Sequence, residues 1–212
     1  MGRLADLDAV TLDANGTLVD LVDPVPKLDR ILRRYGVERP TAAIRRAVEA
    51  EGRVYSGRAA AAHEPVAFAA LQRECAGVFL AEVDAGGLDA EEFAPSYVQS
   101  MEFELVPGVL EALALLRSCG LALGVVANFD LTLSDRLEQL GLARWFSAVV
   151  TPAEAGAAKP DPAIFELALS RLGVRPDRAL HIGDGEVDEA GARAAGLYFE
   201  WAPVAEALER WI

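Results

Sequence analysis

Five short runs of apolar residues constrain the fold of this chain more than any other feature of its sequence. They are apolar along their whole length, a pattern typical of strands that are covered on both faces, as in a parallel sheet. From residue 107 onward, segments of helical character alternate with these runs and end at or near glycine. This alternation predicts an α/β fold, with a doubly wound, mainly parallel sheet in a Rossmann-like core. The five runs span 7–14, 121–128, 146–152, 178–184 and 196–202.

Residues 20 to about 100 interrupt this rhythm. They contain four plausible helices and no convincing strand, so we expect an inserted all-helical cap domain at 20–104, with a core domain formed by 1–19 and 105–212. In open α/β sheets, ligands bind outside the carboxyl ends of the strands. An insert that leaves from the end of the first strand is therefore expected to cover the binding crevice. The four helices are expected at 25–35, 41–55, 65–83 and 90–101.

Composition and charge exclude several classes of protein. At 212 residues, with 52% hydrophobic and 25% charged residues, the chain is long and apolar enough to form a globular core. The net charge of −13 argues against binding to nucleic acid or to an anionic membrane. No apolar stretch approaches the ~20 residues that span a bilayer.

The beginning of the sequence and its cysteines indicate a cellular compartment. The first residues, MGRLADLDAV, lack the pattern of a secretory signal, and Asp6 stands where a myristoylation motif at Gly2 needs serine or threonine. Cys75 and Cys119 lie far apart and do not suggest a disulfide framework. We expect a cytoplasmic protein.

Residues that carry chemistry follow the strand ends. Because the carboxyl ends of parallel strands meet at one edge of a sheet, we expect three carboxylates, one amine and a glycine turn to lie there. Lysine is scarce in this chain, which makes the amine notable. The candidates are Asp13, Asn15, Gly16 and Thr17 after the first strand, Ala127 and Asn128 after the second, Lys159 before a helix, and Asp184 and Asp188 after the fourth strand.

These residue types suit the chemistry of phosphate. Two close carboxylates repel each other and favour a hard cation such as Mg²⁺, which also binds phosphate oxygens. A carboxylate that attacks phosphorus needs its own charge screened and the phosphoryl charge stabilised, which a metal and an ammonium group do. Gly16 would permit close backbone approach, with its N–H directed at an oxyanion.

Four strings in this order resemble the haloacid dehalogenase (HAD) superfamily of hydrolases with a helical cap inserted after the first strand. They are DANGTLVD, VVANFD, AAKPDPAIF and HIGDGEVDEAGARAAG, each at an expected strand end or helix start, and the resemblance covers essentially the whole chain. It implies a small phosphorylated, or otherwise anionic, metabolite as substrate and Mg²⁺ as cofactor.

The resemblance also implies roles for single residues. Asp13 matches the nucleophile that forms a covalent aspartyl intermediate, and Lys159 the lysine that steadies it. Asp184 resembles the Mg²⁺-ligating acid, and Asp188 the acid that holds metal waters or the lysine. The implied metal ligands are Asp13, Asn15 through its backbone carbonyl, Asp184 and Asp188, and the implied substrate-binding residues are Gly16, Thr17, Ala127 and Asn128.

Two positions depart from the family pattern. Phosphatases of this family carry aspartate at the position of Asn15, as general acid and then general base. An amide cannot exchange a proton at neutral pH, so this arm of catalysis, typically worth about 10²–10⁴-fold, should be missing. The family places serine or threonine at Ala127 to bind the phosphoryl group, and Asn128 is the neighbour that would substitute for it.

The sequence therefore leaves three functions open. The first is Mg²⁺-dependent hydrolysis of a phosphate monoester through an aspartyl phosphate, slowed by Asn15 and Ala127. The second is dehalogenation of a 2-haloacid by Asp13, which needs no acid at position 15. The third is a catalytically impaired homologue that binds a phosphate ligand or a protein partner.

Some further residues receive ordinary interpretations. His181 is interpreted as a satisfied core histidine, and His63 as a surface residue where a cap helix begins. Four arginines of the cap segment are candidates for contact with an anionic substrate, although most such arginines are solvated. They are Arg45, Arg46, Arg53 and Arg58.

Overall fold

The computed structural model describes residues 3–62 and 64–212, so Gly2 and His63, to which the sequence analysis gave interpretations, lie outside the described residues. The chain divides into two compact units. We call Met1–Asp20 with Glu104–Ile212 the α/β unit, and Leu21–Phe103 the helical unit. In the described part of the chain, no helix is long and apolar enough to cross a membrane.

A five-stranded parallel sheet forms the centre of the α/β unit, as far as the structure describes it, in the order β5-β4-β1-β6-β7. The chain adds strands on one side of β1 and then returns to add strands on the other side, so β1 lies at the switch point where ligands bind in such sheets. The predicted α/β, mainly parallel sheet is confirmed. The strands are β1 Ala9–Leu12, β4 Ala122–Val126, β5 Ala148–Val150, β6 Ala179–Gly183 and β7 Tyr198–Trp201.

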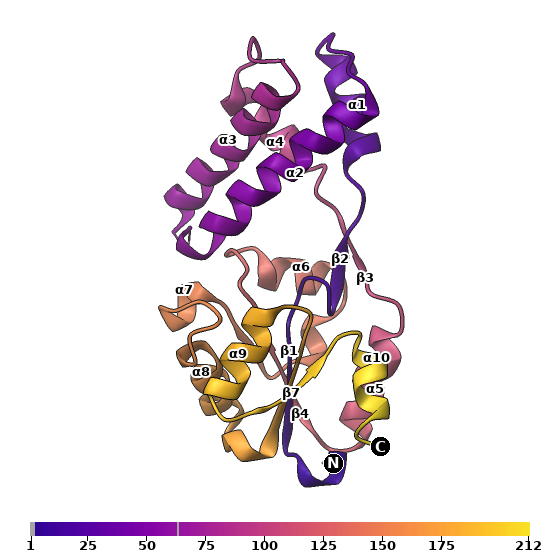
Figure 1. Ribbon diagram of the computed structural model, residues 1–212, viewed down its shortest axis with the longest axis vertical. Helices are drawn as coiled ribbons and strands as arrows, with labels where there is room; N and C mark the ends of the chain where they lie inside the picture. The colour runs from indigo at the N-terminus through magenta and orange to yellow at the C-terminus, as the bar shows by residue number, and fades with distance from the viewer. Residues whose placement is uncertain (1–2, 63) are drawn as a thin grey trace. The chain divides into compact units, whose positions relative to one another are not determined.

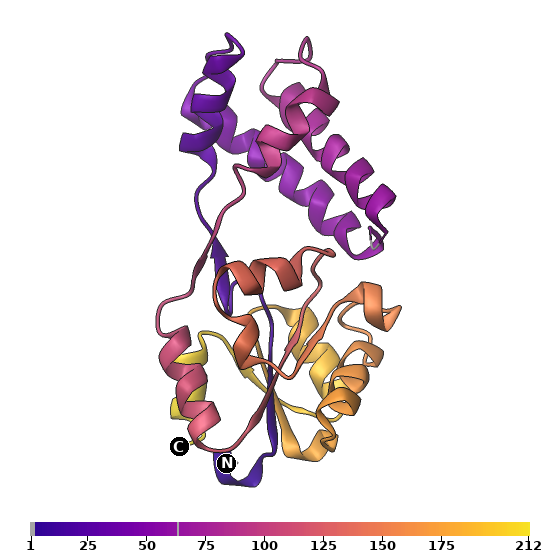
Figure 2. The same ribbon diagram turned by 180° about the vertical axis from the view of Figure 1, so that it is seen from behind.

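Helices cover both faces of this sheet. Figures 1 and 2 show α8 and α9 on one face and α5 and α10 on the other. All residues of β1 and β6 are buried, which explains why these strands are apolar without alternation. The sequence did not predict the short helix after β5. The helices are α5 Val109–Ser118, α6 Leu133–Gln139, α7 Pro152–Ala155, α8 Ala163–Leu172, α9 Glu186–Ala194 and α10 Val204–Glu209.

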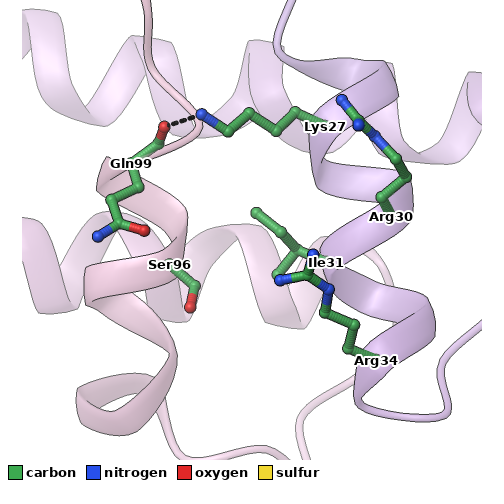
Figure 3. A pocket seen from close by; sticks show the side chains of 6 residues that line it. All are labelled: Lys27, Arg30, Ile31, Arg34, Ser96 and Gln99. Carbon is green, nitrogen blue, oxygen red and sulfur yellow. Dashed lines mark hydrogen bonds between the residues drawn. The ribbon is translucent and has the colours of Figure 1, made fainter.

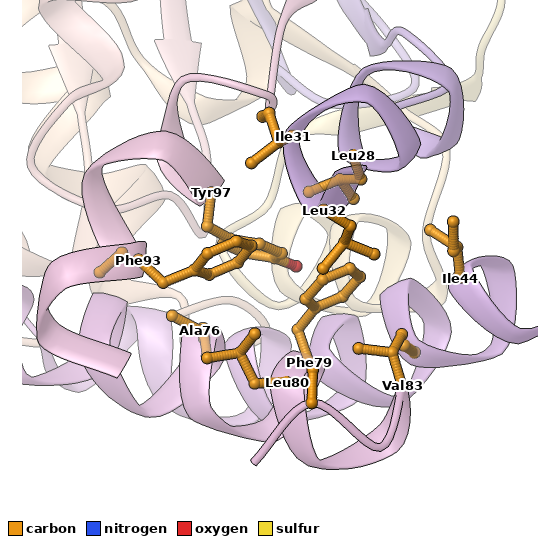
Figure 4. Packing of buried hydrophobic residues seen from close by; sticks show 14 of the residues in the cluster. Leu28, Ile31, Leu32, Ile44, Ala76, Phe79, Leu80, Val83, Phe93 and Tyr97 are labelled. Carbon is orange, nitrogen blue, oxygen red and sulfur yellow. The ribbon is translucent and has the colours of Figure 1, made fainter. Parts of the chain in front are cut away.

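The helical unit has an apolar core of its own, shown in Figure 4. Phe79 and Phe93 stack with ring centroids 5.9 Å apart, and the ring of Tyr97 lies 5.1 Å from that of Phe79. The four helices predicted for this segment are confirmed. They are α1 Val25–Arg34, α2 Thr41–Arg58, α3 Pro65–Glu82 and α4 Ala90–Val98.

A two-stranded sheet lies where the chain passes between the units, and the sequence analysis missed it. It pairs β2 (Val19–Leu21) with β3 (Phe103–Leu105). The expectation that residues 20 to about 100 hold no strand is therefore wrong at its start, where β2 lies, and β3 falls just beyond that range. Strands of three residues are too short to give a periodic pattern in the sequence.

Candidate active site

A cavity of about 180 Å³ lies at the carboxyl edge of the sheet in the α/β unit. The strand register extends to this edge, because the Asp13 backbone N–H donates to Ile182 O (2.9 Å) and the Ala127 N–H donates to Val150 O (3.1 Å). Residues from four separate segments therefore meet at one place. The cavity is lined by Asp13, Asn15, Ala127, Asn128, Phe129, Lys159, Asp184, Gly185, Val187 and Asp188.

The ammonium group of Lys159 is buried among acceptors. Its Nζ donates to Asp13 Oδ1, to Asp188 Oδ1 at 2.5 Å and to the Val126 carbonyl oxygen at 3.1 Å. Only 2% of the Lys159 side chain is exposed. A lysine ammonium has three donors, so these contacts use all of them. Lys159 is held in one position between two carboxylates.

Burial changes the pKa of Asp13. Loss of solvent raises the pKa of its carboxyl, Lys159 lowers it and the Asp188 charge raises it, and the resulting pKa is about 6. Without a metal, this carboxyl takes up a proton near pH 6 rather than near pH 4. Its negative charge is therefore held by its partners, not by water.

Three carboxylates can hold a cation together. One ligand oxygen each from Asp13, Asp184 and Asp188 lies within 4.8 Å of the others. Asp184 is exposed, and partial burial followed by the Asp188 charge raises the pKa of its carboxyl. A set of hard oxygen donors beside water suits Mg²⁺, so the residues present fit this ion.

Asp188 already has partners at both carboxylate oxygens. Oδ1 accepts from Lys159 and lies 3.0 Å from His181 Nε2, while Oδ2 accepts from the Gly185 N–H at 3.1 Å. Of the two roles that the family resemblance implies for Asp188, holding the lysine is the one this geometry displays. Asp184 is the one exposed acid of these three.

Two glycines permit these close approaches. Gly16 has a φ of +79°, and a Cβ there would lie 2.1 Å from Asp184 Oδ2. At Gly183, a Cβ would lie 2.5 Å from Asp188 Cγ. A side chain at either position would therefore displace an acid of the site.

The first motif differs from expectation in one contact. The Gly16 N–H donates to Val19 O (2.8 Å), so the prediction that it points at an oxyanion is wrong, because the turn itself uses this donor. Thr17 is fully buried and is absent from the described lining of the cavity. The substrate-binding roles of Gly16 and Thr17 stay predictions.

The two departures from the family pattern both lie on the cavity wall. Asn15 is exposed there, and Ala127 presents only a methyl group. Asn128 has a partner that the sequence did not indicate: its Nδ2 donates to Lys159 O (2.9 Å), and its Oδ1 accepts from the Lys159 N–H (2.7 Å). This amide clamps the backbone of the lysine. Its predicted contact with substrate stays a prediction.

His181 is a core histidine, as predicted, but one that reaches the site. It is fully buried, and burial lowers its pKa below the ordinary value. Its Nδ1 lies 2.9 Å from Thr11 Oγ1 and its Nε2 lies 3.0 Å from Asp188 Oδ1. Sequence reasoning missed this contact because it requires the register of β1 and β6, which place Thr11 beside His181.

A second cavity, of about 140 Å³, lies in the helical unit between α1 and α4 (Figure 3). Its lysine, Lys27, donates to the Gln99 carbonyl and to Glu102 Oε1 (2.5 Å). Two arginines of the helical unit have acidic partners as well, since Arg45 binds Asp23 at 2.9 Å and Arg58 binds Glu74 at 2.6 Å. The cavity is lined by Lys27, Arg30, Ile31, Arg34, Ser96 and Gln99.

A buried aspartate, a lysine and two further acids at the edge of a parallel sheet match the arrangement expected of a HAD hydrolase. The model of a hydrolase family, described as haloacid dehalogenase-like hydrolase, matches residues 7–196. The chain belongs to this family, and the assignment made from the four sequence strings is confirmed.

Individual relatives include proteins named as phosphatases. Haloacid dehalogenase-like hydrolase domain-containing protein 3 of Bos taurus is 43% identical over 122 residues, 54% of this chain and 49% of that protein. Phosphoserine phosphatase of Thermus thermophilus is 37% identical over 123 residues, 56% of this chain and 49% of that protein. The chain thus spans about half the length of these curated relatives.

A solved structure shares the fold over most of the chain. The crystal structure of a HAD phosphatase from Thermococcus onnurineus is 26% identical and aligns with a TM-score of 0.56. The alignment covers 92% of this chain and 86% of that one.

Proposed function

We propose that the chain is a Mg²⁺-dependent phosphatase that hydrolyses a small phosphorylated metabolite through an aspartyl phosphate at Asp13. The observation that carries this proposal is the buried contact of Asp13 with Lys159. An oxygen of Asp184 lies close enough to one of Asp13 for both to bind the same metal ion. The relative named as a phosphoserine phosphatase supports the same reaction class.

The proposed reaction has two steps on one carboxylate. An Asp13 oxygen forms a bond to phosphorus as the bond from phosphorus to the leaving oxygen breaks. Water then attacks the aspartyl phosphate, releases phosphate and restores the Asp13 carboxylate. Bound Mg²⁺, held by Asp13, Asp184 and the Asn15 carbonyl, would supply positive charge to the phosphoryl oxygens.

Lys159 supplies the second positive charge. Its ammonium holds one oxygen of Asp13, which orients the carboxylate and offsets the charge that develops during transfer. Asp188 and Asn128 fix the two ends of this lysine, since one binds its Nζ and the other its backbone. The Lys159 ammonium is therefore positioned against Asp13 without any contribution from a bound substrate.

Asn15 predicts which step is slow. Natural alkyl phosphates need a proton on the leaving oxygen, and the second step needs a base for water, but an amide supplies neither. Ala127 removes a further hydroxyl from the phosphoryl position. With p-nitrophenyl phosphate the leaving group needs no proton, so the missing acid at position 15 impairs only the second step. The aspartyl phosphate should then accumulate.

The test is a rapid-mixing assay with p-nitrophenyl phosphate and Mg²⁺. We expect a burst of p-nitrophenol that approaches one equivalent of enzyme, followed by slow turnover, and no burst without Mg²⁺ or in Asp13→Asn. Wild-type protein that releases no more p-nitrophenol than Asp13→Asn at high enzyme concentration would contradict the proposal.

The dehalogenase alternative is favoured by one observation, the absence of an acid at position 15. The acids that lie within reach of one cation oppose it, since attack on carbon with loss of halide needs no metal. Release of chloride from 2-chloropropionate by the wild type, without Mg²⁺ and without phosphatase activity, would favour the dehalogenase.

If the chain is instead a catalytically impaired homologue, Asn15→Asp should create a phosphatase activity that the wild type lacks.

We propose further that residues 20–104 act as the cap domain of this family, on the core formed by 1–19 and 105–212. Their inserted position and all-helical core support this role. Replacement of the segment by a short linker should abolish selectivity among phosphorylated metabolites and spare the hydrolysis of p-nitrophenyl phosphate. Unchanged selectivity would contradict the cap assignment.

The compartment that we propose for the protein is the cytoplasm.

A further inference from the structure

A buried series of side chains leads from the centre of the sheet to the candidate nucleophile. It runs from Thr11 to His181 (2.9 Å), from His181 to Asp188 (3.0 Å), from Asp188 to Lys159 (2.5 Å) and from Lys159 to Asp13. Thr11 and His181 are fully buried, and the other three residues are 6% exposed or less. The series joins β1, β6, α9 and the segment before α8.

The chemistry of the groups fixes the direction of these hydrogen bonds. An ionised carboxylate only accepts, so His181 Nε2 carries the proton and donates to Asp188. The other ring nitrogen, Nδ1, then has a lone pair and accepts from the Thr11 hydroxyl. Asp188 therefore selects the tautomer of His181, and the Thr11 hydroxyl donates to the Nδ1 lone pair that this tautomer presents.

The imidazole ring is held independently of Lys159. Thr11 and His181 are register partners on β1 and β6. The His181 ring also packs edge to face against Phe165, with the ring centroids 4.9 Å apart. Asp188 packs closely over Gly183, where a Cβ would lie 2.5 Å from its Cγ and would displace it. The histidine is thus a rigid support for one oxygen of the Asp188 carboxylate.

We propose that Thr11 and His181 are positioning residues that orient Asp188, so that Asp188 holds the Lys159 ammonium against Asp13. This inference rests on the proposed function and deepens it. Thr11 and His181 are fully buried and lie outside the described lining of the cavity, so their contact with the site is through Asp188. They act through Lys159, by keeping the reacting oxygen of Asp13 in place.

The test compares four variants in the burst assay. His181→Leu removes the donor, His181→Gln places an amide N–H near the position of Nε2, and Thr11→Val removes the hydroxyl at nearly constant shape. Leu180→Val perturbs the same buried strand without touching the series. It serves as the matched control for lost packing.

We expect His181→Leu to slow the burst about 10- to 100-fold with KM nearly unchanged, because a misplaced reacting group loses rate rather than affinity. His181→Gln should recover most of the rate. Thr11→Val should slow the burst about three- to tenfold, the value of one hydrogen bond. Equal burst rates in His181→Leu and Leu180→Val would overturn the proposal, as would a failure of His181→Gln to exceed His181→Leu.

A second measurement separates this inference from the proposed function. Crystal structures of wild type and His181→Leu report the positions of Asp188 and Lys159 whether or not the protein is active. A rotated Asp188 carboxylate and a longer distance from Lys159 Nζ to Asp13 would support the positioning role, even if no p-nitrophenol is released. Unmoved side chains would overturn it. If His181→Leu does not fold, Thr11→Val and His181→Gln are compared by the same criteria.

Discussion

The two lysines of the chain make the same kinds of contact in opposite surroundings. Lys159 in the α/β unit binds a backbone carbonyl and two carboxylates, and Lys27 in the helical unit binds a backbone carbonyl and one carboxylate. The Lys159 side chain is 2% exposed, whereas that of Lys27 is 32% exposed and its partner Glu102 is 61% exposed. A list of contacts alone would not tell these two sites apart.

Burial decides what each contact can do. Water screens the pair at Lys27, so we expect it to add little to stability and to be replaceable. At Lys159, the ammonium and its two carboxylates are buried away from water and contact one another instead. Removal of one group would therefore leave the others charged, buried and unpaired. Only the second arrangement can hold a nucleophile, a cation and a metal in fixed positions. The comparison predicts large effects in the α/β unit and small ones in the helical unit.

The largest effect is expected from Asp13→Asn. The variant removes the attacking oxygen, so burst and steady-state release of p-nitrophenol should both fall by about 10⁴-fold or more. The matched control is Asp23→Asn in the helical unit, an exposed acid paired with Arg45, which should keep full activity. Similar losses in both variants would break the comparison.

The next largest effect is a gain of function in Asn15→Asp. A carboxylate at this position can protonate the leaving group and activate water, so steady-state turnover should rise about 10²–10⁴-fold. The burst should disappear because the second step no longer limits turnover. Rapid-mixing kinetics measure both. A wild type that already turns over as fast as the variant would show that the site does not lack this acid.

The two lysines can be compared by stability. Lys159→Met leaves Asp13 and Asp188 facing each other without a cation, and the free energy of unfolding should fall by about 3–5 kcal/mol. Lys27→Met breaks an exposed pair and should cost less than about 1 kcal/mol. Urea denaturation at pH 7 measures both. Equal losses would show that burial does not distinguish the two sites.

The smallest effect concerns the pH dependence of Mg²⁺ binding. Because the pKa of Asp13 is raised to about 6, this carboxyl is ionised at pH 7 and protonated at pH 5. The metal competes with that proton, so affinity for Mg²⁺ is full above the raised pKa and is lost as the pH falls. Calorimetric titration should show a Kd about tenfold weaker at pH 5 than at pH 7. A Kd that is the same at both pH values would contradict the assignment of Asp13 as a ligand.

The sequence predicted the parts of the molecule that depend on periodicity and on strand ends. Continuous apolar runs marked the strands, and the acids at the ends of the first and fourth runs, with the lysine before a helix, marked the edge where Asp13, Lys159 and Asp184 meet. It could not predict contacts set by register or by distant loops. The pair Thr11–His181 depends on how β1 lies against β6, and the Asn128 clamp on Lys159 joins residues 31 positions apart.

Two smaller failures have similar causes. The strands β2 and β3 are three residues long, below the length at which alternation can be recognised. The Gly16 N–H was expected to face a ligand, but a local turn to Val19 uses it. A motif identifies a turn, whereas the direction of each donor in the turn depends on the backbone that follows.

The most direct test of the central claim is to trap the phosphoryl group on Asp13. Wild-type protein is mixed with Mg²⁺ and p-nitrophenyl phosphate, quenched in acid during the burst and treated with borohydride, which reduces an acyl phosphate to an alcohol. Peptide mass spectrometry should then find residue 13 converted from aspartate to homoserine, only in samples that received substrate. An unmodified Asp13 peptide during an observed burst, or conversion at a different acid, would contradict the account.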